Sequence, residues 1–587
     1  MAEPRLHQMV KAIHHEAFYS SGTWIDEELG MYVGWTVRSG SFSDGMPLCN
    51  EKGDVTLVFS GEEYCQPGTA TRLEDRGHSL DVKPASYLVH LYEDNPRFLP
   101  QLNGLFHGLM VDRTRRTALL FNDRYGMHRL YYHESKDGLY FAAEAKAILA
   151  VLPELRQPDQ KSLGEFVSCS CVLEDRTIFQ QIRALPAASV WVVQDGMVQK
   201  KETYFQPQEW EEQEALEPEP FYLQLRQTLS RNLPLYFQSN EQSGIALTGG
   251  LDTRVIMAWH EAQRGTLPCY TFGGMFRDCR DVKVARRVSQ QCGQAHQVIQ
   301  VGDEFLRQFP HYAERTAYLT EGAVDVYRAP DLYVSERARR IAPAKVVGTY
   351  GSEIVRHAVM FKPMAPADGL FHPDFLTHVH QARETYTRIR SGHPVTFAAF
   401  RQSPWYHHGV LGLEQSQLTV RSPFLDNDFV RTVYRAPQGA ASNGDVRLRL
   451  IRDGSSALSR IPSDRGVGGS AISRGWLEFS FKAEYAYDYG MPQWLVNIDR
   501  SLSALRLQRL FLGRHKFSHF RVWYRDWLGD YLKQILLDPI ALSRPYVDRK
   551  SLTTMVESHV NGRGNYTTSI HKLLTLELLH RQFFDHK

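Results

Sequence analysis

Hydrophobic and polar positions divide the chain into two regions with different repeats. In the first 200 residues, short apolar or alternating runs are separated by Asn-Gly, Asp-Gly and Tyr-Gly pairs, which favour turns. These runs predict strands at Val55–Phe59, Leu119–Phe121, Leu130–Tyr132 and Leu139–Phe141. After residue 220, helical spacing alternates with short apolar runs. This alternation indicates a parallel sheet with helices on both faces.

Local patterns in the second region predict individual elements. We expect strands at Ile245–Leu247, Cys269–Phe272 and Lys345–Val347, and helices at Phe221–Leu233, Thr253–Gln263 and Val282–Gln291. From about Arg447 onward the pattern is mostly helical, with amphipathic spacing over Trp527–Ile540 and Ile570–Phe584. Residues 206–220 are acidic and end in two prolines, which favours a linker between the two regions.

The segment Ile245–Arg254, Ile-Ala-Leu-Thr-Gly-Gly-Leu-Asp-Thr-Arg, carries the strongest chemical signal. It predicts a buried strand, a turn at Gly249–Gly250 that permits positive φ and close ligand approach, and a helix start. Such a turn favours an anion, and Asp252 fits there if a divalent cation bridges it to a phosphate. The loop resembles the pyrophosphate loop (PP-loop) of ATP pyrophosphatases, with Thr248 and Thr253 at its serine positions. An ordinary glycine turn is the alternative interpretation.

Composition narrows the class of protein. The chain has 587 residues, 43% hydrophobic and 12% aromatic, which indicates more than one globular domain. A net charge of +2 gives no sign of nucleic acid binding, no apolar run is long enough to span a membrane, and we identify no signal peptide. Seven scattered cysteines favour reduced thiols and a cytoplasmic protein. Neither the cysteines nor the 24 histidines have zinc-ligand spacing, so we expect no zinc site.

Longer blocks of sequence resemble the glutamine-dependent asparagine synthetases along most of the chain. They cover residues 58–64, 102–116, 121–132, 138–149, 420–426 (Val-Arg-Ser-Pro-Phe-Leu-Asp) and 527–579. Ordered blocks are more specific than one short loop. The resemblance implies an N-terminal Ntn-hydrolase-like α+β sandwich. A doubly wound parallel sheet of the ATP-pyrophosphatase (adenine nucleotide α-hydrolase-like) type would follow, with a helical C-terminal part.

The first region departs from that family at its nucleophile. In the family, a cysteine at the first mature position hydrolyses glutamine, and its own α-amine is the base. Here position 2 is Ala2, the first cysteine is Cys49, and the family's opening Cys-Gly-Ile-x-Gly strand is missing. Gly61, Glu62 and Asp123 match family residues that hold glutamine, and without a nucleophile we interpret them as scaffold. We therefore expect no glutaminase activity.

The family's second loop, Gly348–Ile354 in this chain, also differs. The family's catalytic Glu becomes Tyr350 and its metal-binding Asp becomes Glu353. A carboxylate is retained, so the resemblance implies magnesium held between Asp252 and Glu353. In having a tyrosine at this position, the chain resembles the β-lactam synthetases, in which that tyrosine helps to deprotonate an amine of the substrate. In that family the tyrosine is paired with a glutamate, and the matching position in this chain is His407. The histidine could act as a base or have only a structural role.

A third departure concerns the family lysine that stabilises charge on the adenylate and pyrophosphate. Asp464 falls at the lysine position and Arg465 follows it. An arginine can bind phosphate with bidentate geometry, so Arg465 is our candidate replacement. Leu247, Phe272 and Gly348 match positions around the family's adenine and ribose, although the first two would equally serve as strand core.

Together these features predict a degenerate glutaminase-like domain over 1–205, an acidic linker over 206–220, and a synthetase-like domain over 221–587 with an aromatic-rich insertion near 475–523. We expect an AMP-forming carbon–nitrogen ligase that uses ATP and Mg2+ to adenylate a carboxylate for amide formation. The alternative is a catalytically degenerate nucleotide-binding or regulatory relative. Expected partners are small-molecule or peptide carboxylates and amines, without nucleic acid or membrane; a homodimer is left open.

Overall fold

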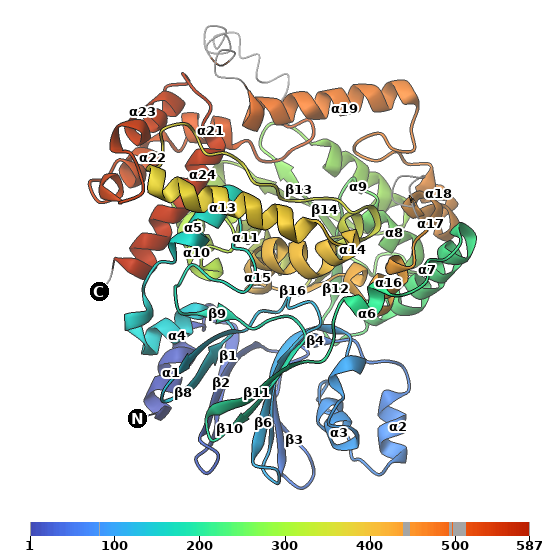
Figure 1. The fold of residues 1–587 in the computed structure, drawn as a ribbon. Coiled ribbons are helices and arrows are strands. Elements are labelled where there is room, and N and C mark those ends of the chain that lie inside the picture. Colours follow the sequence, from blue (N-terminus) through green and yellow to red (C-terminus); the bar gives the residue numbers. More distant parts are fainter. Residues whose placement is uncertain are drawn as a thin grey trace.

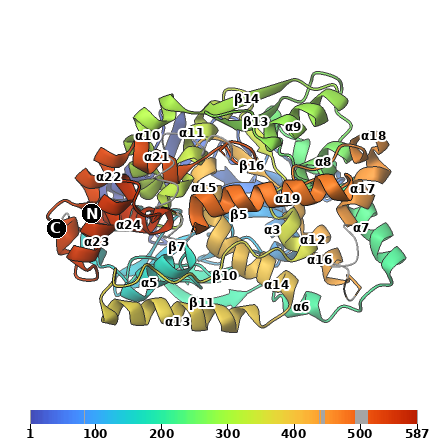
Figure 2. The same cartoon turned by 90° about the horizontal axis from the view of Figure 1, so that it is seen from above.

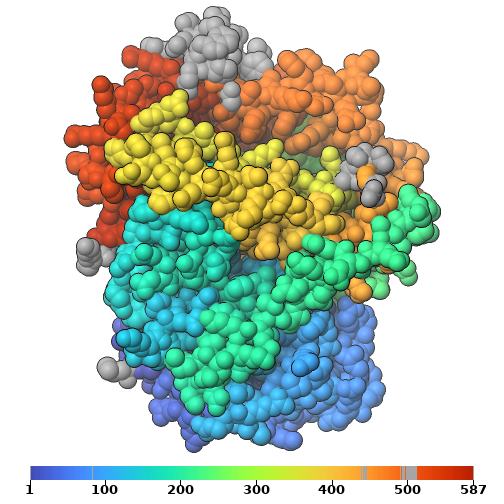
Figure 3. Space-filling view, in the orientation of Figure 1, coloured from blue at the N-terminus to red at the C-terminus, as the bar shows by residue number. Residues whose placement is uncertain are grey.

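The structure is a computed structural model that describes residues 2–81, 83–437, 439, 446–491, 496 and 512–585. The N-terminal domain forms the lower body of the molecule in Figure 1, and the remaining chain forms the upper body. The space-filling view in Figure 3 gives the same division, with blue to teal residues below and yellow to red residues above.

Strands β1–β11 build the N-terminal domain. The larger sheet is antiparallel in the order β11-β10-β6-β5-β4-β3. Its members are β3 (Leu48–Cys49), β4 (Val55–Glu63), β5 (Gly104–Asp112), β6 (Thr117–Asn122), β10 (Ser189–Gln194) and β11 (Met197–Thr203). The smaller strands are β1 (Tyr19–Asp26), β2 (Met31–Arg38), β7 (Tyr131–Ser135), β8 (Gly138–Ala142) and β9 (Arg183–Ala184). The helices are α1 (Ala2–Ala12), α2 (Thr69–Asp75), α3 (Tyr87–Asp94), α4 (Ala145–Val151) and α5 (Gln160–Cys169).

Side-chain alternation along β4 produces two separate cores in this domain. Leu57 and Phe59 pack with α3 on one face of the larger sheet, whereas Val58 packs with β2 on the other face. Val10 of α1 then lies directly over Gly34 of β2. The layers are therefore helix, sheet, sheet and helix, which is the Ntn-like α+β sandwich that the resemblance implied.

Strands β12–β16 form the sheet of the second domain, and all its pairs are parallel. The order is β14-β13-β12-β15-β16, with bounds β12 (Ser243–Ala246), β13 (Cys269–Gly274), β14 (His296–Val301), β15 (Ala344–Val346) and β16 (Thr419–Arg421). The chain starts in the centre at β12, moves outward to β14, and returns to β15. Strand order therefore reverses between β12 and β15, which confirms the doubly wound sheet and defines a switch point there.

Helices surround this sheet and make up most of the C-terminal part, which confirms that prediction. The helices before residue 420 are α6 (Gln208–Glu211), α7 (Pro218–Asn232), α8 (Asp252–Trp259), α9 (Arg280–Gln291), α10 (Asp303–Thr320), α11 (Ala329–Ala338), α12 (Gly351–Arg356), α13 (Pro373–Arg390), α14 (Pro394–Phe397) and α15 (His408–Gln415). Those after it are α16 (Asn427–Tyr434), α17 (Val446–Gly454), α18 (Ser456–Ser459), α19 (Ala471–Tyr485), α21 (Phe520–Asp526), α22 (Gly529–Leu536), α23 (Arg549–Val560) and α24 (Thr567–Leu579). No helix in the described part of the chain is both long and apolar enough to cross a bilayer.

The acidic segment 206–220 packs against the protein core, whereas the start of the aromatic-rich segment near 475–523 lies on the outside of the second domain. The acidic segment 206–220 contains α6, whose Trp210 is buried against Phe205 and Phe400. Helix α19, the start of the aromatic-rich segment near 475–523, lies along the outer side of the second domain, away from the N-terminal domain (Figures 1 and 2). Residues 492–495 and 497–511 of that segment lie outside the described residues.

The Val420–Asp426 motif joins the two domains. Arg421 on β16 donates to both carboxylate oxygens of Glu62 on β4, at 2.8 and 2.5 Å, and the guanidinium is almost fully buried. Asp426 accepts from the Asn103 amide of the N-terminal domain at 2.8 Å. A bidentate Arg–carboxylate pair fixes both distance and orientation, so these contacts set the register of one domain on the other.

We expect Glu62→Gln to lower the free energy of unfolding by about 3 kcal/mol, because it removes the bidentate partner of the buried Arg421 charge and leaves only the Glu241 carboxylate, 3.9 Å away. Urea denaturation would measure the loss. Glu202→Gln is a suitable control, since Glu202 pairs with Lys200 on the surface and such pairs contribute little. Equal midpoints for the two variants would contradict a structural role for the pair.

Candidate nucleotide site

The first loop of the site leaves the sheet at its switch point. β12 ends at Ala246, the turn passes through Gly249–Gly250, and α8 begins at Asp252. The Leu247 N–H donates to the Tyr270 carbonyl at 2.9 Å, which keeps the start of the loop attached to the neighbouring strand. Strand, turn and helix start therefore lie beyond the carboxyl end of the central strand, where sheets of this topology bind ligands.

Two threonine hydroxyls stabilise this loop. The Gly250 N–H donates to Thr248 Oγ1 at 3.2 Å, and Thr248 Oγ1 lies 3.4 Å from Thr253 Oγ1. Gly249 and Gly250 are both described, and neither has a positive φ, contrary to the expectation from sequence. The reason for glycine is therefore close packing rather than backbone handedness.

Asp252 lies at the centre of a hydrogen-bonded cluster with Ser352 and Arg447. Its Oδ2 accepts from Ser352 Oγ at 2.8 Å, and its Oδ1 accepts from Arg447 Nη1 at 2.5 Å. Arg447 Nη1 also donates to Ser352 Oγ at 2.7 Å. Burial raises the pKa of Asp252, Arg447 lowers it, and the nearby Glu353 carboxylate raises it. The carboxylate is thus held between one cation and a second carboxylate.

Glycines allow the second loop, between β15 and α12, to approach Asp252. A Cβ on Gly351 would lie 2.8 Å from Asp252 Cγ, and a Cβ on Gly348 would lie 2.5 Å from the Thr253 nitrogen. Real Cβ atoms do not come this close, so any side chain at either position would separate the loops. The predicted residue Gly348 therefore positions the site through its backbone.

Glu353, His407 and Tyr350 lie together behind this loop, and all three are buried. Glu353 Oε1 is 3.4 Å from His407 Nε2, and the Tyr350 ring packs edge-on against the His407 ring at 5.3 Å. Tyr350 has a φ of 75°, a strained value for a bulky residue that is typical of functional sites. Burial raises the pKa of Tyr350, and the carboxylates of Glu414 and Glu353 raise it further, so the hydroxyl keeps its proton.

Two carboxylates lie against the phosphate loop, where the family resemblance implies a lysine. The Gly249 N–H donates to Asp281 Oδ1 at 2.7 Å, and the Gly249 carbonyl accepts from the Asp464 N–H at 3.0 Å. A Cβ on Gly249 would lie 2.6 Å from Asp464 Cβ. Burial raises the pKa of both carboxyl groups, and the charge of Asp464 raises that of Asp281 further. A backbone N–H of the phosphate loop is therefore donated to a protein carboxylate.

Arginines flank the same region. Arg465 is exposed, and its guanidinium lies 4.4 Å from the centre of the Phe481 ring on α19. Arg254 is buried and donates to the carbonyls of Gly249, at 3.3 Å, and Ile461. Arg254 thus ties the phosphate loop to the segment that carries Arg465, although it was not a predicted site residue.

The two candidate adenine-contact residues have different environments. Leu247 is 1% exposed and belongs to the main hydrophobic core. Phe272 near the end of β13 is half-buried, and its ring meets Phe517 edge-on at 5.7 Å. The Leu247 side chain therefore packs in the core, whereas Phe272 retains an accessible face beside the aromatic-rich segment.

Sequence reasoning missed Ser352 and Arg447. Ser352 lies inside the second loop, next to Glu353, so its hydroxyl beside a carboxylate was the available signal. Arg447 reaches Asp252 from α17, far away in the sequence, and no local pattern marks it. A tertiary contact of this kind requires the structure.

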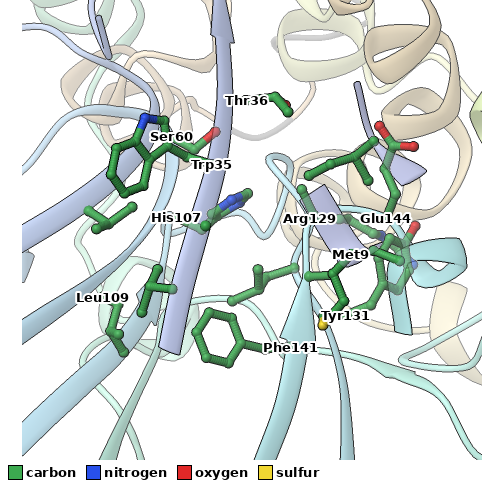
Figure 4. Close-up of a pocket in the computed structure, with 18 of the residues that line it drawn as sticks. Met9, Trp35, Thr36, Ser60, His107, Leu109, Arg129, Tyr131, Phe141 and Glu144 are labelled. Atoms are coloured by element: carbon green, nitrogen blue, oxygen red, sulfur yellow. The ribbon is translucent and has the colours of Figure 1, made fainter. Parts of the chain in front are cut away.

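A cavity of about 650 Å³ lies where the N-terminal domain meets the second domain (Figure 4). Trp35 and Phe141 provide apolar walls, and Ser60 and His107 are among its polar lining. Ser60 Oγ lies 2.9 Å from His128 Nε2, and the imidazoles of His107 and His128 stack at 4.6 Å. Burial lowers the pKa of His107 to about 4 and that of His128 well below its usual value, so both rings are neutral at pH 7.

We expect His107→Gln to weaken the acid sensitivity of the fold. The unfolded histidine binds a proton near pH 6.5 and the folded one near pH 4, so the wild type loses stability as pH falls through this window. From pH 7 to pH 5 this histidine contributes a loss of about 2 kcal/mol, which the variant lacks. Urea midpoints at both pH values would measure the difference. His133→Gln, which changes a histidine whose Nδ1 also faces a carbonyl, should retain the wild-type loss.

Comparisons with known proteins agree with this geometry. A family model for the glutamine amidotransferase domain matches residues 1–205, and one for asparagine synthase matches residues 224–347. Glutamine-hydrolyzing asparagine synthetase 1 of Bacillus subtilis (strain 168) is 24% identical over 302 residues, covering 50% of this chain and 46% of its own. Asparagine synthetase B of Escherichia coli (strain K12) is 23% identical over 430 residues, covering 69% and 68%.

The chain therefore spans less than half the length of the B. subtilis asparagine synthetase 1 that it matches. A solved structure of glutamine phosphoribosylpyrophosphate amidotransferase from B. subtilis aligns with 45% of this chain and 75% of its own, at 10% identity and a TM-score of 0.24. The Ntn-like domain followed by a doubly wound sheet defines an amidotransferase-type architecture. The two family models, matched in this order, and the two relatives support an asparagine synthetase family member, of the ATP-dependent amidotransferase-type ligases.

Proposed function

We propose that this protein is an ATP-dependent ligase that adenylates a carboxylate and transfers the acyl group to an amine, releasing AMP. The observation that carries the proposal is the convergence of two loops at the switch point, where Asp252, Ser352 and Arg447 form one hydrogen-bonded cluster. A helix start favours phosphate, and α8 starts within this loop, at Asp252. The N–H groups of Gly249 and Gly250 donate to Asp281 and Thr248, so a phosphate would have to replace these two partners.

The oxygen donors at these loops fit magnesium. Asp252 and Glu353 are close enough for the second carboxylate to raise the pKa of the first, and Ser352 adds a hydroxyl oxygen. Divalent cations of this class prefer such oxygen ligands. Asp252 and Glu353 would hold the ion, which would neutralise charge on the departing pyrophosphate. Arg447 would bind phosphate oxygen beside them, since its guanidinium already faces the same space.

His407 and Tyr350 are our candidates for handling the amine. His407 has a neighbouring carboxylate in Glu353, an arrangement suited to accepting a proton and stabilising the resulting imidazolium. Tyr350 retains its proton, so we assign it hydrogen bonding to the substrate rather than proton abstraction. Arg465 would move from Phe481 toward the phosphates when nucleotide binds, with Phe272 beside the base.

We further propose that the nitrogen comes from an amine rather than from glutamine hydrolysis. The residues that match glutamine-holding positions are engaged within the protein. Glu62 pairs with Arg421, and the Asp123 carboxylate accepts backbone N–H groups from Tyr125, Met127 and His128. A glutamine in this domain would have to displace these contacts.

A second candidate function is a nucleotide-binding or regulatory relative without catalysis. The observation that favours it is the carboxylate pair Asp281 and Asp464 against Gly249, where negative charge opposes phosphate binding. In that case the fold would bind nucleotide weakly and turn over no substrate.

Pyrophosphate release with Mg-ATP and a panel of amino acids and peptides tests the ligase proposal, with AMP measured in parallel. We expect equal amounts of AMP and pyrophosphate with at least one carboxylate–amine pair. Calorimetric binding of ATP without turnover of any pair would support the regulatory candidate instead. Absence of both binding and turnover would contradict each of them.

A further inference from the structure

We propose that the N-terminal domain contains a zinc site formed by Glu51, His78, His90 and Glu93. One ligand atom from each of these side chains lies within 4.8 Å of all the others. The site is remote from the phosphate loop and belongs to a different domain, so it is independent of the ligase proposal. It is accessible to ions, because Glu51 is 42% exposed whereas His90 is buried at 2%.

Three structural segments bring these residues together. Glu51 lies in the turn between β3 and β4, His78 follows α2, and His90 and Glu93 occupy one face of α3 at i and i+3. Figure 1 shows α2 and α3 to the right of the larger sheet, on the side of its edge strand β3. A metal bound here would tie the α2–α3 segment to that edge.

Three of the distances between inward-facing atoms lie near the value for tetrahedral zinc. His90 Nδ1 lies 2.8 Å from Glu93 Oε2 and 3.8 Å from Glu51 Oε2, and His78 Nδ1 lies 3.5 Å from Glu93 Oε2. Zinc bonds of about 2.0–2.1 Å place tetrahedral ligand atoms roughly 3.3 Å apart. The observed distances lie on both sides of this value, so small side-chain rotations would admit the ion.

The outer atoms of three of the side chains are already held, as metal ligands require. His78 Nε2 lies 3.2 Å from Asp94 Oδ1, which favours the tautomer with the proton on Nε2 and leaves the Nδ1 lone pair facing inward. Arg76 in turn pairs with Asp94 at 2.6 Å. The imidazole–carboxylate contact is the typical outer partner of a zinc-binding histidine.

Both glutamates have the same arrangement. Glu93 Oε1 accepts from the Asn50 amide at 2.7 Å, and Glu51 Oε1 accepts from the Ser79 N–H at 2.7 Å. In each case Oε2 is the atom that faces His90.

The chemistry of the set favours a transition metal over magnesium and calcium, and a closed set of four ligands favours zinc. Imidazole nitrogen suits zinc, copper, iron and nickel, whereas magnesium and calcium prefer oxygen alone. Four protein ligands leave no open position, which is typical of a structural zinc site. Zinc held by Nδ1 would require the His90 tautomer with its proton on Nε2, and any proton shared between Nδ1 and Glu93 would pass to solvent.

The expectation from sequence that the chain has no zinc site relied on ligand spacing. The spacing from residue 51 to 78 to 90 has no counterpart in zinc motifs, and only His90 and Glu93 are close in sequence. The fold makes the cluster through the β3–β4 turn, which the sequence pattern does not reveal.

Metal analysis of the full-length protein tests the site. The protein is stripped with chelator, titrated with Zn2+ alone, and assayed by calorimetry and elemental analysis. We expect wild type and His7→Ala, a change at an exposed histidine on α1, to bind one more zinc per chain than His78→Ala or Glu93→Gln. This comparison discounts zinc bound by cysteines or by the nucleotide site, because those groups are the same in every variant.

A second readout separates binding from folding defects. Zinc should raise the melting temperature of wild type and His7→Ala and leave His78→Ala unchanged. If Glu93→Gln unfolds the domain, Glu51→Gln at an exposed side chain gives the same comparison. Equal zinc content in wild type, His78→Ala and Glu51→Gln would overturn the proposal.

Discussion

Asp252→Asn is expected to reduce pyrophosphate release at least 100-fold while leaving the fold intact. The neutral amide keeps the shape of the side chain and an acceptor for Arg447, but it removes the negative charge shared with Glu353. A metal held by one carboxylate instead of two would stabilise the departing pyrophosphate poorly, and losses of two to three orders of magnitude are typical when one such group is removed. Steady-state kinetics with saturating Mg-ATP would measure the change.

The control for this experiment is Asp195→Asn. Asp195 is exposed in the β10–β11 turn with a φ of 49°, a conformation that asparagine tolerates. It should keep wild-type activity. Retention of full activity by Asp252→Asn, or of the cellular role of the protein, would show that catalysis at this loop is not the function.

Asp464→Lys is expected to tighten binding of ATP or pyrophosphate by at least 10-fold. In the native protein, the Asp281 carboxylate and the Asp464 backbone lie against Gly249, and the charge of Asp464 makes Asp281 harder to ionise. A triphosphate must approach against any charge that remains on the pair. Replacing one carboxylate by an ammonium converts repulsion into attraction, and about 1.4 kcal/mol of this change is enough for the 10-fold effect.

Calorimetric titration of the variant with Mg-ATP would give the affinity. Asp464→Asn separates the two contributions, because it removes the repulsion without adding a cation, and it should give an intermediate affinity. Asp195→Asn again serves as the remote control. An unchanged dissociation constant for Asp464→Lys would mean that this loop does not contact the phosphates, and the assignment of Arg465 would then be wrong as well.

The central part of the fold could be predicted because its signals are local. The apolar runs Ile245–Leu247 and Cys269–Phe272 are followed by polar or glycine turns, and they became β12 and β13. Helix α8 ends at Trp259 rather than at Gln263, because His260 adopts an extended conformation and stacks on Phe237 at 3.5 Å. A stacking partner from another element is invisible to helical periodicity.

Strand β16 could not be predicted for a related reason. Thr419–Arg421 contains one apolar residue, and it forms a strand through pairing with β15 and burial of Arg421 against Glu62. Both partners are distant in sequence, so no local pattern marks the strand. Family blocks located the motif but not its role as a joint between domains.

The nucleotide site divides in the same way. Its two loops are contiguous segments, so the sequence alone could propose Thr248–Thr253 and Glu353 as candidates. The groups that set their charge, Arg447 and Asp281, arrive from other elements, α17 and α9. Candidate residues within the two loops could therefore be proposed from the sequence, whereas the charged residues that contact these loops from other elements required the structure.

The contacts at β16 connect the interface between the two domains to the second loop of the candidate site. Arg421 holds the N-terminal domain, and the next residue, Ser422, donates to the Thr349 carbonyl at 2.6 Å in the loop before Tyr350. Adjacent residues thus connect the interdomain cavity wall to the second nucleotide loop. This chain of contacts runs from Glu62, which lines the interdomain cavity, to the carbonyl that precedes Tyr350. We therefore expect a ligand that displaces Glu62 in the cavity to disturb the second loop as well.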